Sequence, residues 1–492
     1  MDKEKSAGYK ETLKSTSIFG GVQVLNILIQ IIRSKFVALY LGPAGMGVVG
    51  LLTSTTGLIG NLTNFGVGMS AVKNVAEADA QIDKTPLARI VKVVLRLSLL
   101  TGLLGMVVTI VMAPLLSKFT FDNYEYTLAF ILISVTLLIN QMVAGNMVVL
   151  QGMRQIKPLA IASVIGTLAG TIVAIPVYYF FAEKGIVPVI IFTAFISLLI
   201  TLIFVKRIKF PIVQIGRDEF KTESWSIMKL GFVIGLSGLL SVGTAYLLRI
   251  FIVRTGDLAD VGYYNAGFSI INTYVGLVFT AMGTDYFPRL SAVSNDNQKS
   301  NSIINQQIEI ALLILAPILA VFIVFIHWMV IALYSSQFSP VNPYLHWAAL
   351  GIFFKATSWA LAFIFVAKGE KKLFFRTELI ASVYMLLLNL AGYYLDGLRG
   401  LGIAFCAGYF VYLLHVYIIC QRLFSFSFSA ESLGILIKFL TLLVATFLVS
   451  KSVSNPYNYI FGSLLILFVS ALSFKALDER IGLYAKLKAL RK

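Results

Sequence analysis

Long apolar segments follow one another along almost the whole chain, separated by short clusters of charged residues, proline and glycine. Each segment is long enough to cross a hydrocarbon core roughly 30 Å thick as an α-helix. We therefore expect an all-α polytopic membrane protein with no large soluble domain between its helices. The pattern predicts about 14 transmembrane helices, over residues 14–41, 44–72, 88–117, 124–152, 158–181, 185–206, 225–254, 261–288, 302–334, 342–367, 373–395, 400–423, 432–450 and 457–475.

Composition agrees with this pattern and excludes several classes of protein. Of the 492 residues, 58% are hydrophobic and only 13% are charged, whereas about a quarter of a soluble domain is charged. The two cysteines, Cys406 and Cys420, lie on one predicted helix about 21 Å apart, too far for a disulfide. No His/Cys cluster or Walker A loop is present. We expect no cofactor, no metal site and no catalytic residues.

The net charge of +17 suggests topology rather than nucleic-acid binding, because the basic residues concentrate in alternate loops. Cytoplasmic loops of membrane proteins carry the excess of Lys and Arg. This rule predicts a multi-pass protein with both termini in the cytoplasm. The outer loops then hold few basic residues, namely Lys118, Lys184, Arg254, Arg399 and Lys451.

Several short matches at one constant offset indicate an internal duplication. Two copies that each contain six helices share their topology, so an axis along the membrane normal should relate them. The repeat predicts a first lobe at residues 1–207, a cytoplasmic linker at 208–224 and a second lobe at 225–424. Residues 425–492, with two more helices and a basic cytoplasmic tail, lie outside the repeat. The matches pair Tyr178, Tyr179 and Gly185 with Tyr393, Tyr394 and Gly400, and Gly47 and Gly68 with Gly262 and Gly283.

Polar side chains within the predicted helices are candidates for a cargo cavity, because a polar group in lipid needs a partner or water. Gln23, Asn26, Gln30 and Arg33 are spaced three, four and three residues apart, which places them on one helix face. Polar stripes also run along 44–72, 225–254 and 261–288; those along 44–72 and 261–288 contain Asn64 and Asn272 respectively. The alternative is that such residues mediate close helix packing.

The charges inside the apolar segments are mostly basic. Arg33, Lys35 and Arg249 lie near the outer helix ends, and Lys35 and Arg249 align within one residue in the repeat. Their side chains either face the cavity or extend to the membrane surface. Lys355 lies midway along its helix, where that extension is difficult. A basic cavity suits a phosphate or pyrophosphate group and poorly suits a cationic drug. For Asp285, Glu309 and Glu378, near the inner helix ends, we expect local ion pairs.

The segment Leu41-Gly42-Pro43-Ala44-Gly45-Met46-Gly47, followed by a Gly- and Thr-rich helix to Gly68, resembles the Wzx-type O-antigen and lipid III flippases. These form the polysaccharide transporter branch of the MOP (MATE-like) superfamily. The resemblance implies two six-helix lobes, with segments 14–41, 44–72, 225–254 and 261–288 lining a cavity. It also implies a cargo of undecaprenyl-pyrophosphate-linked oligosaccharide, moved from the cytoplasmic to the periplasmic leaflet of the bacterial inner membrane. The cavity's basic residues would be Arg33, Lys35, Arg249 and Lys355.

Other functions stay open at this point. A MATE-type, cation-coupled multidrug antiporter has the same fold but would be expected to carry deep carboxylates. A membrane-embedded polysaccharide polymerase or ligase would normally expose catalytic residues in a large outer loop, and none is predicted. A scaffold without transport activity explains the paired polar stripes less well. For a flippase, the expected partners are the anionic lipid-linked oligosaccharide, membrane lipids and a coupling ion, either proton or sodium.

Overall fold

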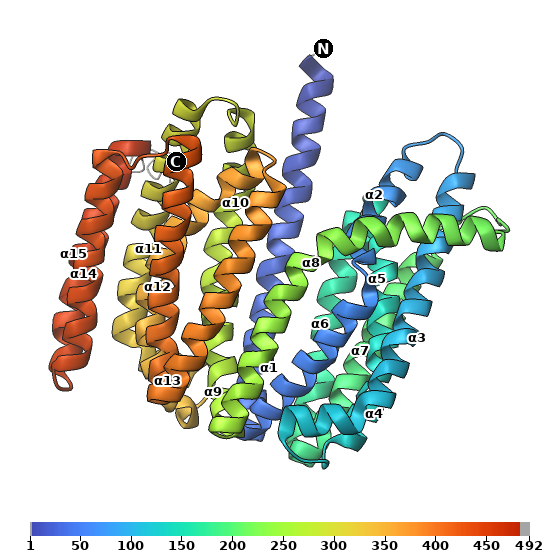
Figure 1. Cartoon of the computed structure of the whole chain (residues 1–492), viewed down its shortest axis with the longest axis horizontal. Coiled ribbons are helices and arrows are strands. Elements are labelled where there is room, and N and C mark those ends of the chain that lie inside the picture. Colours follow the sequence, from blue (N-terminus) through green and yellow to red (C-terminus); the bar gives the residue numbers. More distant parts are fainter. Residues whose placement is uncertain (1, 483–492) are drawn as a thin grey trace, which may run out of the picture. The chain divides into compact units, whose positions relative to one another are not determined.

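The computed structural model describes the backbone of residues 2–482 and most of their side chains. It leaves out the side chains of residues 2–20, 69, 230, 232–234, 236–237, 274–275, 277, 280–281, 284 and 481. The end of the predicted basic tail, residues 483–492, lies outside the described range. Within that range every element of regular secondary structure is a helix and there is no strand, which confirms the predicted all-α fold (Figure 1).

The helices follow the predicted apolar segments closely. In chain order they are α1 (Asp2–Asn64), α2 (Val67–Asp79), α3 (Thr85–Phe121), α4 (Thr127–Ile133), α5 (Val135–Gly152), α6 (Ile156–Phe181), α7 (Ile186–Lys206), α8 (Arg217–Thr255), α9 (Leu258–Ser269), α10 (Gly276–Ala292), α11 (Asn297–Leu333), α12 (Asn342–Ala367), α13 (Lys371–Phe424), α14 (Ala430–Ser452) and α15 (Tyr457–Ile481).

Ten of the described helical segments are long and apolar enough to span a membrane. Three of them, with 44, 51 and 54 residues, are each more than about 60 Å long at 1.5 Å per residue, which is two crossings rather than one. Their interruptions fall where the sequence predicted helix ends. These are the left-handed Gly42, the 3-10 turn Ala182–Gly185 and the non-helical pair Asp396 and Gly397.

Two predicted helices contain interruptions that the sequence pattern does not predict. Segment 44–72 breaks at Phe65 and Gly66, whose φ angles of 51° and 67° are left-handed. Segment 261–288 contains a π-helical turn, Ile270–Val275. Non-helical backbone at membrane depth needs protein or water around it to satisfy its polar groups. The break at Gly66 is surrounded by protein. A Cβ atom on Gly66 would overlap the backbone carbonyl of Gly231 in α8.

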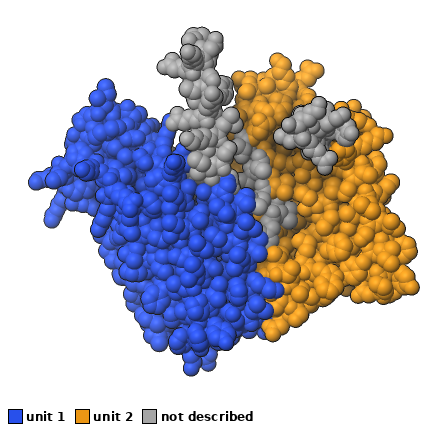
Figure 2. Space-filling view, turned by 180° about the vertical axis from the view of Figure 1, so that it is seen from behind, with its two compact units in different colours: residues 1–262 blue, residues 263–492 orange. Residues whose placement is uncertain are grey.

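The chain forms two compact units, residues 1–262 and 263–492 (Figure 2). The boundary lies after α8, not in the 208–224 linker, because α8 is attached to the first unit at both ends. Near its start, Glu219 forms an ion pair with Arg89 at 2.7 Å. Near its end, the Tyr246 hydroxyl lies 2.7 Å from the hydroxyl of Thr120 in α3. The division into two six-helix lobes therefore stays a prediction from the repeat.

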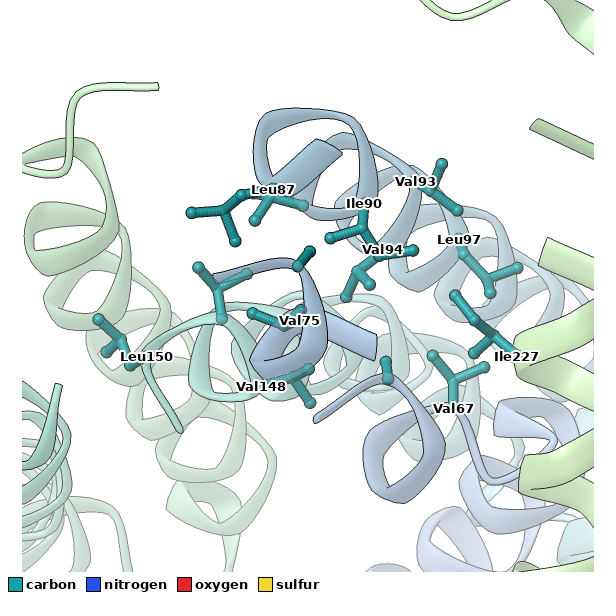
Figure 3. Close-up of a cluster of buried hydrophobic side chains, with 14 of the residues drawn as sticks. Val67, Val75, Leu87, Ile90, Val93, Val94, Leu97, Val148, Leu150 and Ile227 are labelled. Carbon is teal, nitrogen blue, oxygen red and sulfur yellow. The ribbon is translucent and has the colours of Figure 1, made fainter. Parts of the chain in front are cut away.

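The core of the first unit joins α2, α3, α5 and the start of α8 through aliphatic side chains. Val75, Val94, Val148 and Ile227, one from each of these helices, belong to a single buried cluster (Figure 3). Next to this cluster, the Ser70 hydroxyl donates to the carbonyl of Ile227 at 2.8 Å. Apolar packing and this hydrogen bond together attach the start of α8 to α2.

Two glycines that the repeat equates are in reciprocal contact. A Cβ atom on Gly47 would overlap the backbone carbonyl oxygen of Leu258, and one on Gly262 would overlap that of Pro43. Pro43 and Leu258 are themselves separated by the repeat offset. The same agreement occurs elsewhere, since Gly185 and Gly400 each lie against the residue eight positions earlier. The close approach of α1 and α9 therefore requires glycine on both sides.

In the second unit, α14 and α15 pack on α11 (Figure 1). The buried carboxylate of Glu309 in α11 accepts hydrogen bonds from Ser432 in α14 at 2.7 Å and from Arg480 in α15 at 2.8 Å. The start of α11 is capped by Asp296, whose carboxylate accepts from the amides of Gln298 and Lys299. The hydrogen bond from the Lys299 amide lowers the pKa of Asp296 below its ordinary value.

The ion pairs expected for three carboxylates have mixed outcomes. Asp285 pairs with Arg289 at 3.2 Å, as predicted. Glu309 also forms an ion pair, but with Arg480, which is distant in the sequence. Glu378 instead accepts a hydrogen bond from the Tyr412 hydroxyl at 2.5 Å. The ion pair expected for Glu378 is therefore wrong: no ion pair of the described residues includes it. Its partner is Tyr412, because α13 folds back and brings the two side chains together.

We predict that Gly262→Val destabilises the protein by about 1–3 kcal/mol, because the added side chain overlaps backbone that cannot move aside cheaply. Thermal unfolding of purified protein in one detergent measures this. Gly57→Val is the matched control, since a Cβ atom at Gly57 has no neighbour within 4 Å. Equal melting temperatures for the two variants would refute the requirement for glycine.

We predict that Arg480→Met destabilises the protein by about 3 kcal/mol, because it leaves the Glu309 carboxylate buried without its counter-charge. Thermal unfolding and limited proteolysis between α13 and α14 measure the loss. Glu431→Gln is the control: its side chain is 78% exposed and its contact with Arg480 is 3.5 Å long, so it should cost less than about 1 kcal/mol. A loss as large in the control would show that exposed charges hold these helices.

Candidate substrate-binding site

The polar stripe of α1 is divided between two environments. Asn26 is only 8% exposed, and its amide nitrogen donates to the Ser163 hydroxyl of α6 at 2.9 Å. Gln23 and Gln30, three and four residues away, are exposed. For Asn26 the structure therefore shows helix packing, the alternative reading of the stripe. Its side-chain oxygen is buried without a partner among the described residues.

Arg33 and Lys35 lie further along α1 and are both partly buried. The Arg33 guanidinium is within hydrogen-bonding reach of the Tyr178 hydroxyl in α6. Arg33 lies seven residues, or about two helical turns, from Asn26, so both side chains meet the same neighbouring helix. In the sequence, Tyr178 stands out only as a repeat match, and no local signal shows that it contacts Arg33.

Arg249 and Asn64 lie on separate segments of the first unit. Arg249, in α8, is partly buried and donates to the carbonyl of Ala245 one turn earlier, at 2.9 Å. Asn64 is the last residue of α1, directly before the break at Phe65 and Gly66. A polar side chain at an interrupted transmembrane helix is a common feature of transporter binding sites.

In the second unit, the structure brings together two predicted site residues, Lys355 and Asn272. The Lys355 ammonium of α12 donates to the side-chain oxygen of Asn272 at 3.1 Å. It also lies 5.2 Å from the ring centroid of Tyr409 in α13 and 5.9 Å from that of Phe279 in α10. The sequence had selected Lys355 and Asn272 individually, but it had not predicted their contact or the two aromatic partners.

Asn272 contacts Lys355 from an irregular part of its segment. Asn272 lies inside Ile270–Val275, and its amide nitrogen donates to the carbonyl of Phe268 at 3.1 Å. That bond orients the amide and leaves its oxygen to accept from Lys355. Such π-bulges occur frequently at functional sites.

The described contacts of the Lys355 ammonium are all with uncharged groups. Among the described residues, the ion pairs do not include Lys355. Its contacts, an amide oxygen and two ring faces, stabilise the cation without cancelling its charge. This group can therefore donate charge-assisted hydrogen bonds to an anion.

We found no metal-type cluster in the part of the chain that the structure describes: no three His, Cys, Asp or Glu side chains gather there. The described site is thus built from cations, amides and aromatic rings.

Comparison with known proteins identifies the family. The model of the polysaccharide biosynthesis protein family Polysacc_synt_3 matches residues 36–343, more than half of the chain. This match includes the segment that resembled the Wzx-type flippases, and it confirms that resemblance. No curated protein sequence matches the chain.

Solved structures share the fold at low sequence identity. The lipid II flippase MurJ, in an inward closed conformation, has a TM-score of 0.69 and 14% identity, covering 95% of this chain and 99% of its own. An inward-facing MATE multidrug resistance transporter of the MOP superfamily has a TM-score of 0.65 and 16% identity, covering 82% and 94%. A MOP superfamily transporter from Pyrococcus furiosus, described as having a binding pocket of reverse polarity, has a TM-score of 0.56 and 16% identity, covering 84% and 96%.

These structures show that the chain shares the fold of MurJ and of the MATE transporters. The chain is a multi-pass membrane protein that belongs to the polysaccharide biosynthesis protein family.

Proposed function

We propose that this protein is a flippase for an undecaprenyl-pyrophosphate-linked oligosaccharide of the O-antigen type. It moves its cargo from the cytoplasmic to the periplasmic leaflet of the bacterial inner membrane, with both termini in the cytoplasm. The observation that carries the proposal is Lys355, a cation within a transmembrane helix whose described contacts are all uncharged. Membership of a polysaccharide biosynthesis family supports the cargo class.

The chemistry follows from the charge of the site. A pyrophosphate offers several anionic oxygens, and the Lys355 ammonium can donate to them while Asn272 and the aromatic rings hold its stem in place. Arg33, Lys35 and Arg249 are further basic residues that we assign to cargo binding, with Gln23, Gln30 and Asn64 as polar contacts. For Asn26, we infer a supporting role through its bond to Ser163.

We infer that the protein works by alternating access, so that the basic site opens to one membrane face and then to the other. The charged headgroup crosses inside the protein, where the cations offset its loss of hydration. The polyprenyl tail remains in the lipid, where its transfer has no comparable cost. We propose a proton or sodium gradient, or the membrane potential, as the energy source.

The second candidate is a cation-coupled multidrug antiporter, favoured by the fold shared with MATE transporters. A cationic drug would approach the Lys355 ammonium, and like charges repel strongly in a medium of low dielectric constant. The charge of the described site therefore favours an anionic cargo over a cationic one.

We predict that Lys355→Gln lowers the rate of lipid translocation about 10-fold or more, because a hydrogen bond to a charged group contributes about 1.5–3 kcal/mol. Proteoliposomes containing a labelled undecaprenyl-pyrophosphate oligosaccharide report its movement between leaflets. Lys372→Gln is the matched control, since Lys372 is exposed at the start of α13 and should transport at the wild-type rate.

Two results would contradict this proposal. Equal rates for Lys355→Gln and Lys372→Gln, with transport by the wild type intact, would remove Lys355 from the cargo site. Absence of lipid movement in the wild type, together with ion-coupled export of a small cation, would favour the multidrug antiporter instead.

A further inference from the structure

A group of aromatic side chains continues from the Lys355 site along α12 and α10. Phe279 contacts Lys355 on one side and Trp359 on the other, with 5.5 Å between the Phe279 and Trp359 ring centroids. Trp359 also lies against Phe363, at 4.8 Å between centroids. The cation of the site is thus connected directly to an aromatic surface.

Lys355 and Trp359 share one face of α12. They are four residues apart, so they are neighbours on the helix surface with Cβ atoms about 5–6 Å apart. The next residues before Trp359, Thr357 and Ser358, are fully buried, whereas the indole is only partly buried. A partly exposed ring therefore lies one turn from a cation.

The neighbouring backbone is shaped to fit this indole. A Cβ atom added to Gly283 in α10 would lie 3.3 Å from Cζ2 of Trp359, closer than ordinary contact. Phe279, one turn earlier on α10, contacts the same ring, and so does Tyr286, whose ring centroid lies 5.9 Å from that of Trp359. Three positions of α10 therefore bound the indole, two of them aromatic and one without a side chain.

The combination of a cation and an aromatic face matches one class of ligand. In a glycosyl phosphate, a sugar ring is attached directly to an anionic phosphate, at about the separation of two neighbouring helix positions. One face of a pyranose consists of C–H groups, which pack on an aromatic ring, while its hydroxyls point outward to polar partners. An unglycosylated prenyl pyrophosphate would use the cation but not the ring.

We propose that Trp359, supported by Phe279 and accommodated by Gly283, recognises the sugar attached to the pyrophosphate, while Lys355 binds the pyrophosphate itself. This proposal rests on the proposed flippase function and names the part of the site that distinguishes a glycosylated carrier from a bare one. Trp359 is then a residue for specificity, and Lys355 a residue for binding the anion.

Binding to two probes tests the division of roles. The full-length protein in lipid nanodiscs is titrated with farnesyl pyrophosphate and with the same molecule carrying N-acetylglucosamine on its terminal phosphate. We expect Trp359→Leu to weaken binding of the glycosylated probe roughly 3- to 10-fold, the range of an aromatic contact, and to leave farnesyl pyrophosphate within about 2-fold. We expect Lys355→Gln to weaken both probes.

Two further variants separate recognition from folding. Trp359→Phe keeps an aromatic face and should recover part of the affinity for the glycosylated probe. Trp328→Leu is the control, because Trp328 is exposed on α11 and its loss should change neither affinity.

Four results would overturn the inference. Equal weakening of both probes by Trp359→Leu would assign the indole a structural role, and unchanged binding of both would exclude it from the site. Binding of both probes with equal affinity by the wild type would show that no sugar is recognised. Failure of the wild type to bind either probe would remove the proposed flippase function as well, whereas loss of both only in Lys355→Gln supports that function.

Discussion

The hydrocarbon solvent is the constraint on which the rest of this structure depends. Water is absent from the bilayer core, so every backbone and side-chain polar group there needs a partner within the protein. The helices satisfy their own backbones, and many hydroxyls follow the same rule locally, as Thr101 and Thr109 do by donating to carbonyls four residues earlier. The polar groups too large for this solution, such as amides and charges, must find partners on other helices, and they determine which helices meet.

The described intramembrane polar residues fall into two kinds, according to whether their partners on other helices neutralise them. Some join helices, as Asn26 joins α1 to α6 and Glu309 joins α11 to α14 and α15. Lys355 differs because its contacts are neutral and leave its positive charge available. The distinction separates residues that hold the fold together from one suited to an anionic cargo. It also explains why an intramembrane polar stripe does not by itself indicate a cavity.

The duplicated sequence has visible consequences in packing. Gly47 and Gly262, equated by the repeat, each lie against the backbone beside the other, and Gly185 and Gly400 occupy equivalent positions after their helix turns. A side chain would prevent each of these close approaches, so glycine is required for steric reasons. Yet the compact units do not coincide with the repeats, because ion pairs, hydrogen bonds and apolar packing attach α8 to the first unit.

The sequence alone predicted the all-α membrane fold, the positions of its helices and several residues of the candidate site, because the preference of each segment for lipid or water is local information. It also identified the family resemblance at residues 41–68. Tertiary structure decided the partners: Lys355 meets Asn272, 83 residues away, and Glu309 meets Arg480, 171 residues away. It also revealed the breaks at Gly66 and at the π-helical turn around Asn272. These features depend on the rotation and order of packed helices, which arise from contacts summed over the whole unit and leave no periodic signal in any one segment.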